Sequence, residues 1–183
     1  MSAFIRSLRP KQWPKNGIIY FALVFTLPGR WDPQQPLDVL EPLGVTTAAF
    51  LLFCLLSSAT YLVNDVVDAA QDRAHPLKQH RPIASGGLSA GVASVAAAAM
   101  MAGGAALSLL LTPWFGVVAL LYLGLTLAYS LGLKRISIVD VLALSAGYVL
   151  RAAAGAVVLD VPISPWLYIV TSLGAMLIGF GKR

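Results

Sequence analysis

The protein has 183 residues, of which 58% are hydrophobic and 11% are charged, whereas about 25% of residues are charged in a typical soluble domain. These residues cannot supply the polar surface of a soluble domain, so we expect lipid to solvate the outer face. The net charge of +5 would favour a nucleic acid partner in a soluble protein. Here the basic residues stand between apolar runs, which favours the lipid bilayer and phosphate groups as partners, and no nucleic acid.

Apolar runs follow one another along most of the chain, and six of them approach the roughly 20 residues that a helix needs to cross a bilayer. In chain order they are Asn16–Leu27, whose span is expected to begin near Trp13, then Leu43–Val63, Gly91–Leu111, Pro113–Leu131, Ile138–Leu159 and Ile163–Phe180. The sequence therefore predicts an all-α, polytopic transmembrane bundle that forms one membrane-embedded domain over residues 1–183. Small residues are frequent in the third, fifth and sixth runs, so we expect these helices to pack inside the bundle.

Lysine and arginine residues precede the first run and recur in every second loop, whereas the loop after the first run is net acidic. By the positive-inside rule, the N-terminus and the loops after the second and fourth runs are cytoplasmic. We therefore expect a multi-pass protein of the inner (plasma) membrane. Its longest polar segment, residues 64–89, lies on the cytoplasmic side in this prediction.

Acidic side chains cluster at the start of that polar segment, where Asn64, Asp65, Asp68 and Asp72 follow the second run. If the helix continues through them, a turn of about 100° per residue places all four on one face, along about 12 Å of its axis. Three neighbouring carboxylates repel one another, and partial desolvation makes their charged state still more costly. A divalent cation removes this cost, and Mg²⁺ prefers oxygen ligands that it shares with substrate phosphates. The alternative is a solvated polar helix end.

Basic residues follow the cluster closely, among them Arg73, Lys78 and Arg81. Their charges suit phosphate oxygens that a metal leaves uncovered. A basic loop that only fixes the membrane topology is the alternative. Together, the two groups of charges predict a magnesium–diphosphate site with Asn64 and the three aspartates as metal ligands and the aspartates as catalytic residues.

The pattern Asn64-Asp65-x-x-Asp68-x-x-x-Asp72-Arg73 resembles the first aspartate-rich motif of the UbiA-type prenyltransferase superfamily. The resemblance implies an all-helical membrane enzyme that binds Mg²⁺ and a diphosphate in a cavity facing the cytoplasm. The segment Tyr129-Ser-Leu-Gly-Leu-Lys134 is similar to a Tyr-x-x-x-x-Lys segment of that family. This similarity implies that Tyr129 and Lys134 contact the diphosphate.

The opening Arg9-Pro-Lys-Gln-Trp-Pro-Lys-Asn16 looks most like the decaprenyl-phosphate phosphoribosyltransferase branch of the family. That branch implies transfer of a 5-phosphoribosyl group from phosphoribosyl pyrophosphate to a polyprenyl (decaprenyl) phosphate. Diphosphate is released, and the product serves the synthesis of cell-wall arabinan (arabinogalactan) precursors. Family members have about nine helices and a second polar motif in the C-terminal half. We therefore expect this chain to be the N-terminal two-thirds of the fold, either as a fragment or as a natural truncation.

Four further residues are candidates for substrate binding. Lys11 and Lys15 would lie at the membrane surface before the first span, as phosphate contacts or as topology anchors. Asp140 would neutralise a nearby basic residue, hold a ribose hydroxyl or bind a second cation. Arg151 lies about 16 Å further along the same helix, where a charge is costly and usually faces a cavity or a partner. It would bind the lipid phosphate or hold the bundle together.

Two other functions stay open at this point. An enzyme of the same fold would use a prenyl diphosphate donor and an aromatic acceptor, as in quinone-type biosynthesis. A protein of another class would be an inactive truncated relative or a non-catalytic membrane subunit. Whether the chain forms a homo-oligomer is also left open.

Overall fold

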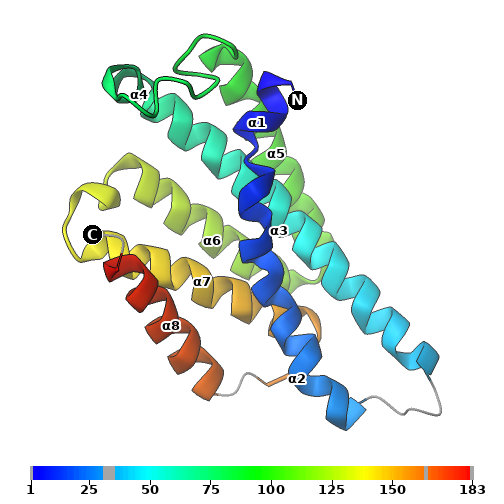
Figure 1. Cartoon of the computed structure of the whole chain (residues 1–183). Coiled ribbons are helices and arrows are strands. Elements are labelled where there is room, and N and C mark those ends of the chain that lie inside the picture. The colour runs from blue at the N-terminus through cyan, green and yellow to red at the C-terminus, as the bar shows by residue number, and fades with distance from the viewer. Residues whose placement is uncertain (1, 31–35, 163–164, 182–183) are drawn as a thin grey trace.

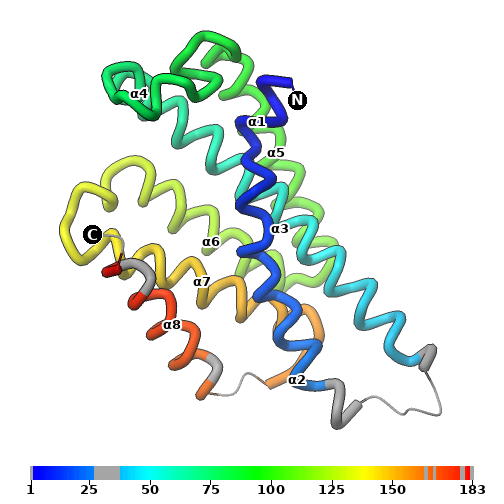
Figure 2. Tube along the Cα trace, in the orientation of Figure 1, coloured from blue at the N-terminus to red at the C-terminus, as the bar shows by residue number. Residues whose placement is uncertain are grey.

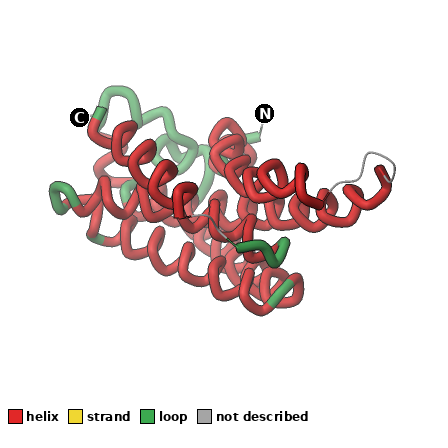
Figure 3. The backbone as a smooth tube through the Cα atoms, turned by 90° about the horizontal axis from the view of Figure 1, so that it is seen from below, coloured by secondary structure: helices red, strands yellow, loops and turns green. Residues whose placement is uncertain are grey.

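The computed structural model of the protein describes residues 2–30, 36–162 and 165–181, and every regular element in these ranges is a helix (Figure 3). In chain order the elements, with η for a 3₁₀ helix, are α1 (Ala3–Ser7), η1 (Pro10–Ile19), α2 (Tyr20–Arg30), η2 (Pro36–Val39), α3 (Leu40–Val67), α4 (Ala69–Ala74), α5 (Ala90–Leu111), α6 (Pro113–Leu131), η3 (Leu133–Arg135), α7 (Val139–Val158) and α8 (Pro165–Phe180). The predicted all-α fold is confirmed.

The predicted spans correspond closely to helices. Among the described residues, the four helices α3, α5, α6 and α7 are long and apolar enough to cross a membrane. Helix α6 has the predicted bounds, because Pro113 suits the first turn and the Thr112 hydroxyl accepts a hydrogen bond from the Phe115 N–H. The protein is therefore a polytopic helical membrane protein, as predicted.

The first and sixth predicted spans form shorter helices. The first is divided between η1, which contains Pro14, and α2. Of the sixth, Ile163 and Ser164 lie outside the described residues, and α8 covers the rest with 16 residues.

Helix α7 lies at the centre of the bundle and contacts α6, α8, η1 and α2 (Figures 1 and 2). More than half of its most apolar 18-residue window is buried, at 56%, as predicted for the fifth run. The corresponding prediction for the third run is wrong, because only 17% of the α5 window is buried. Its small residues form one stripe towards α3 that includes Ala93, Ala97 and Gly104, while Val95 and Leu110 face outwards.

The main core joins α3, α6 and α7. The Phe53 ring packs against the rings of Phe115 and Tyr122, with centroid distances of 5.7 and 5.1 Å. Ile19 of η1 and Ala154 of α7 are fully buried in the same cluster. This core therefore fixes the N-terminal segment against the membrane helices.

One glycine allows this segment to approach α7 closely. A Cβ atom on Gly155 would lie 2.1 Å from the backbone oxygen of Ile19. The obstacle is backbone, so no side-chain rotation could make room for it. Glycine at this position therefore lets η1 lie against α7.

We predict that Gly155→Ala lowers the stability of the protein by about 2 kcal/mol, because overpacking outweighs the better helix propensity of alanine. Thermal unfolding in detergent micelles measures this effect. Gly103→Ala is the matched control, since its Cβ would meet nothing within 4 Å. The control is expected to unfold at the wild-type temperature or above it, and equal Tm values for the two variants would contradict the prediction.

Candidate functional site

The acidic cluster lies where α3 ends. The sequence pattern predicted a helix that continues through the cluster, but in the structure the helix is interrupted there. Helix α3 ends at Val67, Asp68 forms a one-residue break, and α4 begins at Ala69. Aspartate is a poor helix former because its side chain competes for hydrogen bonds with the backbone. Around this break the four side chains form two pairs, each held by a different cation.

The first pair consists of Asp65 and Asp72, whose side chains are only 2% and 4% exposed. Arg81 Nη1 binds both, at 3.2 Å from Asp65 Oδ1 and 2.7 Å from Asp72 Oδ2. Arg9 forms a further ion pair with Asp65 Oδ1, and its guanidinium lies over the Tyr61 ring. Two arginines from separate segments therefore compensate two buried carboxylates.

The second pair consists of Asn64 and Asp68, whose side chains hydrogen-bond to each other. The ammonium group of Lys134 donates to both, at 3.2 Å to Asn64 Oδ1 and 2.5 Å to Asp68 Oδ1. Lys134 reaches them from η3, which links α6 to α7. Lys134 and Arg81, which the sequence marked as candidates for phosphate binding, therefore both lie at the acidic cluster.

The chemistry of these oxygen pairs fits Mg²⁺. Within the described ranges, no three Asp, Glu, His or Cys side chains form a set that could hold a metal ion by themselves. Magnesium rarely needs such a set, because one or two carboxylates usually bind it together with substrate phosphates and water. In each pair the oxygens converge on one cationic nitrogen, so each pair offers hard oxygen ligands at a position that already favours positive charge.

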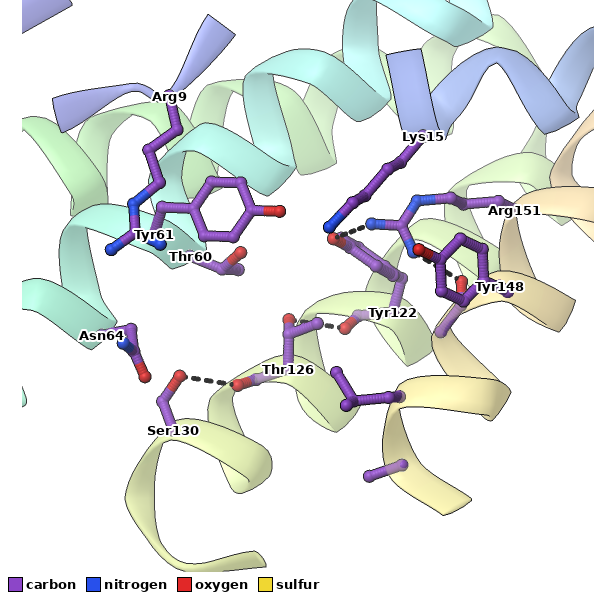
Figure 4. Close-up of a pocket in the computed structure, with 13 residues that line it drawn as sticks. Arg9, Lys15, Thr60, Tyr61, Asn64, Tyr122, Thr126, Ser130, Tyr148 and Arg151 are labelled. Atoms are coloured by element: carbon purple, nitrogen blue, oxygen red, sulfur yellow. Dashed lines mark hydrogen bonds between the residues drawn. The ribbon is translucent and has the colours of Figure 1, made fainter. Parts of the chain in front are cut away.

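A polar pocket of about 160 Å³ adjoins the cluster (Figure 4). It lies between α3, α6, α7 and η1, and two residues of the cluster region, Asn64 and Arg9, form part of its wall. Most of its lining side chains carry hydroxyl, amide or cationic groups. The lining consists of Arg9, Lys15, Thr60, Tyr61, Asn64, Tyr122, Thr126, Ser130, Ala143, Leu144, Gly147, Tyr148 and Arg151.

Arg151 is buried at the α7 side of this pocket, with 7% of its surface exposed. Its Nε donates to Asn16 Oδ1 at 2.7 Å, and its Nη2 donates to the Tyr122 hydroxyl oxygen at 2.9 Å. Its Nη1 donates to the Gly147 carbonyl at 2.9 Å. The predicted intramembrane charge therefore both lines a cavity and joins α7 to η1 and α6.

Other predicted residues lie outside the pocket lining. Lys11 and Lys78 are exposed. Arg73 is exposed as well, and its Nε donates to the Ala84 carbonyl at 3.2 Å, so it secures the loop after α4. Tyr129 is half-buried near the end of α6, and Asp140 is buried in the first turn of α7.

Several pocket residues were missed by the sequence analysis. Arg9 and Asn16 were noted only as part of a motif, although Asn16 is buried and bridges Ser57 and Arg151. A signal existed for the α6 wall, because Tyr122, Thr126 and Ser130 recur every fourth residue in an apolar helix. This spacing places them on one face.

The fold and the pocket define a class: polytopic helical membrane proteins with an acidic cluster beside a polar intramembrane cavity. Comparison with known proteins then identifies the family. The model of the UbiA prenyltransferase family matches residues 19–181, so the chain belongs to this family.

Named relatives support the same assignment. The chain is 36% identical over 183 residues to a decaprenyl-phosphate phosphoribosyltransferase of Mycobacterium tuberculosis, covering 59% of that protein. It is 37% identical over 182 residues to the protein of the same name from Corynebacterium glutamicum, covering 53% of it. The chain therefore spans little more than half the length of these relatives and corresponds to their N-terminal portion.

A solved structure has the same fold. The UbiA homologue from Archaeoglobus fulgidus, bound to DMAPP and Mg²⁺, is similar with a TM-score of 0.76 at 20% sequence identity. The similarity covers 96% of this chain and 60% of the homologue. The helical arrangement is therefore that of the family.

We predict that Arg81→Gln destabilises the protein by about 2 kcal/mol in EDTA, because it leaves Asp72 buried without its cation. Thermal unfolding in detergent measures the loss. Arg73→Gln removes the same charge from the preceding helix α4 and breaks only a carbonyl contact, so its Tm is expected to stay near the wild-type value. A similar Tm for both variants would show that the bridge to Asp65 and Asp72 contributes no stability.

Proposed function

We propose that the protein is a Mg²⁺-dependent transferase that moves a 5-phosphoribosyl group from phosphoribosyl pyrophosphate to a polyprenyl (decaprenyl) phosphate and releases diphosphate. One observation carries the proposal. The acidic cluster adjoins a polar pocket, and both include residues of the same stretch of α3 and of the N-terminal segment. A donor bound by its diphosphate at the cluster would place the group to be transferred in the pocket.

The cluster supplies the diphosphate end of this site. Asp65, Asp68 and Asp72, together with Asn64, would hold one or two Mg²⁺ ions, which supply charge neutralisation for the departing diphosphate. The cationic nitrogens of Arg9, Arg81 and Lys134 already converge on these oxygens. They are therefore placed to donate hydrogen bonds to phosphate oxygens as negative charge grows on the leaving group.

The pocket favours a polar group for transfer over a prenyl chain. Its hydroxyl groups include those of Thr60 and Thr126, which suit sugar hydroxyls. Both hydroxyls donate to backbone carbonyls of their own helices, and their oxygens can still accept hydrogen bonds from sugar hydroxyls, which a prenyl chain lacks.

The similar proteins favour two different donors. The relatives named decaprenyl-phosphate phosphoribosyltransferase favour the phosphoribosyl donor. The Archaeoglobus homologue binds DMAPP, a prenyl diphosphate, on the same fold, so prenyl transfer to an aromatic acceptor is the second candidate. The polar wall of this pocket makes us favour the phosphoribosyl donor.

The acceptor needs little activation. A polyprenyl phosphate is already anionic, so its oxygen can attack the anomeric carbon without a strong base. Its tail would lie between helices in the bilayer. We further propose that the N-terminus and the cluster face the cytoplasm at the inner membrane, and that the product feeds cell-wall arabinan synthesis.

The proposed site differs from the set inferred from the sequence. Lys11, Arg73 and Lys78 are exposed and outside the pocket lining, so we leave them out. Tyr129 and Asp140 remain candidates, for the diphosphate and for the ribose or a second cation.

We predict that Asp68→Ala lowers phosphoribosyl transfer at least about 100-fold while the protein remains inserted. The measurements are transfer of labelled phosphoribosyl groups in membranes, with membrane abundance as the insertion check, and Mg²⁺-dependent thermal protection by diphosphate. Asp160→Ala is the control, because Asp160 is an exposed carboxylate beyond the opposite end of α7. Full activity of Asp68→Ala would remove the metal assignment.

The donor is tested by offering labelled phosphoribosyl pyrophosphate and farnesyl diphosphate in parallel, each with its own acceptor. We expect label from the phosphoribosyl donor to enter the lipid phosphate fraction, because the pocket wall is polar. Incorporation only from farnesyl diphosphate would replace the phosphoribosyl proposal with prenyl transfer.

A further inference from the structure

Arg151 is a buried cation whose hydrogen-bond partners are all neutral: an amide oxygen, a backbone carbonyl and a tyrosine hydroxyl. Among the described residues, no carboxylate forms an ion pair with it. Its guanidinium also lies over two tyrosine rings, 4.8 Å from the centroid of Tyr122 and 5.4 Å from that of Tyr148. These contacts disperse the charge without neutralising it.

A guanidinium has five N–H donors, and the three hydrogen bonds of Arg151 occupy three of them. The remaining donors belong to Nη1 and Nη2, the two terminal nitrogens. Their forked arrangement suits two oxygens of one phosphate. Because an uncompensated charge inside a membrane bundle is costly, an anionic ligand at this position would relieve that cost.

Arg151 is not the only cation of this pocket. Lys15 and Arg9 also line it, and no carboxylate belongs to the lining formed by the described residues. Figure 4 shows Lys15 extending towards Arg151 and Tyr122, while Arg9 lies on the other side of the pocket beside Tyr61. Lys15 and Arg151 therefore concentrate positive charge at one end.

Residues of α6 line the pocket from this end to the end beside the acidic cluster. Ser130 lies towards Asn64, and Tyr122 lies beside Arg151 (Figure 4). Eight residues separate Ser130 from Tyr122, which corresponds to about 12 Å along the helix. The pocket is thus long enough to have two distinct ends, one beside the carboxylates and one beside Arg151 and Lys15.

We propose that the Arg151–Lys15 end of the pocket is a binding subsite for a phosphomonoester dianion, distinct from the diphosphate site at the carboxylates. This inference rests on the proposed function and deepens it. The terminal phosphate of the sugar donor and the phosphate of the lipid acceptor share the required chemistry: compact, doubly charged and rich in acceptor oxygens.

Lys15 provides the sharper test, because Arg151 also holds η1 to α7 through Asn16 and its loss would affect folding. The matched control is Lys11→Gln. Lys11 and Lys15 lie on the same 3₁₀ helix and are both exposed, but only Lys15 lines the pocket.

The experiment measures thermal protection of the full chain in detergent as a function of ribose 5-phosphate concentration, with ribose as the uncharged control. The apparent Kd is expected to rise about tenfold in Lys15→Gln, because one charge-assisted hydrogen bond is lost. Lys11→Gln is expected to stay within about twofold of wild type. Equal Kd values for Lys15→Gln and wild type, or protection by ribose alone, would overturn the subsite.

A parallel titration with farnesyl phosphate identifies the source of the phosphate. Lys15-dependent protection by ribose 5-phosphate alone assigns the subsite to the donor, and protection by farnesyl phosphate alone assigns it to the acceptor. Lys15-dependent protection by both ribose 5-phosphate and farnesyl phosphate supports a subsite that recognises only the phosphate group. Absence of protection by either ligand overturns the proposal.

Diphosphate with Mg²⁺ separates this inference from the proposed function. Its protection depends on the carboxylates and is expected to be unchanged in Lys15→Gln. If the wild type shows no protection by diphosphate with Mg²⁺ but keeps Lys15-dependent phosphomonoester binding, the proposed function fails and the subsite stands. If it is present without Lys15-dependent phosphomonoester binding, the subsite alone fails.

Discussion

The structure depends on a single electrostatic constraint: three aspartates gathered at the end of a membrane helix must be compensated. Asp65 and Asp72 are almost completely buried, and their mutual repulsion would be severe without cations. Arg9 and Arg81 provide the compensation from the N-terminal segment and from the loop after α4. The constraint therefore brings together segments that are far apart along the chain. It places the loop after α4 and the N-terminal segment around one end of α3, where a phosphate-bearing ligand would meet cations from both.

The same groups serve as scaffold and as candidate ligands. Lys134 joins the turn between α6 and α7 to Asp68, and Arg151 joins α7 to η1. A cation that stabilises the fold through a carboxylate or an amide is already held near the position where a ligand phosphate would lie. Because little side-chain freedom remains to be lost, binding through such groups carries a smaller entropic cost than binding through exposed lysines. This difference is the physical reason for favouring Arg81 and Lys134 over Lys78 as ligand contacts.

The membrane helices could be predicted from apolar run length and from local signals. Helix α6 has its predicted bounds because Thr112 and Pro113 define its start within the chain itself. The contacts of Arg9 could not be predicted, since Asp65 lies 56 residues away and no local period links them. The burial of the third run, helix α5, was wrongly predicted for a related reason. Small residues such as Ala93 permit close packing, but the number of neighbouring helices that pack on a helix is a property of the whole bundle.

The polar pocket follows from how η1 packs. Gly155 lets the Ile19 backbone lie against α7, and this places Asn16 beside Arg151, where its amide oxygen accepts a hydrogen bond. Without that close approach, the guanidinium would lose one of its few neutral partners inside the bilayer, which is costly. The η1–α7 contact thus allows a cation to persist within the membrane. The pocket is lined by hydroxyls and cations, on a fold that holds DMAPP in the Archaeoglobus homologue. Under the proposed function, the choice between donors would therefore depend on a few wall side chains and not on the helical scaffold.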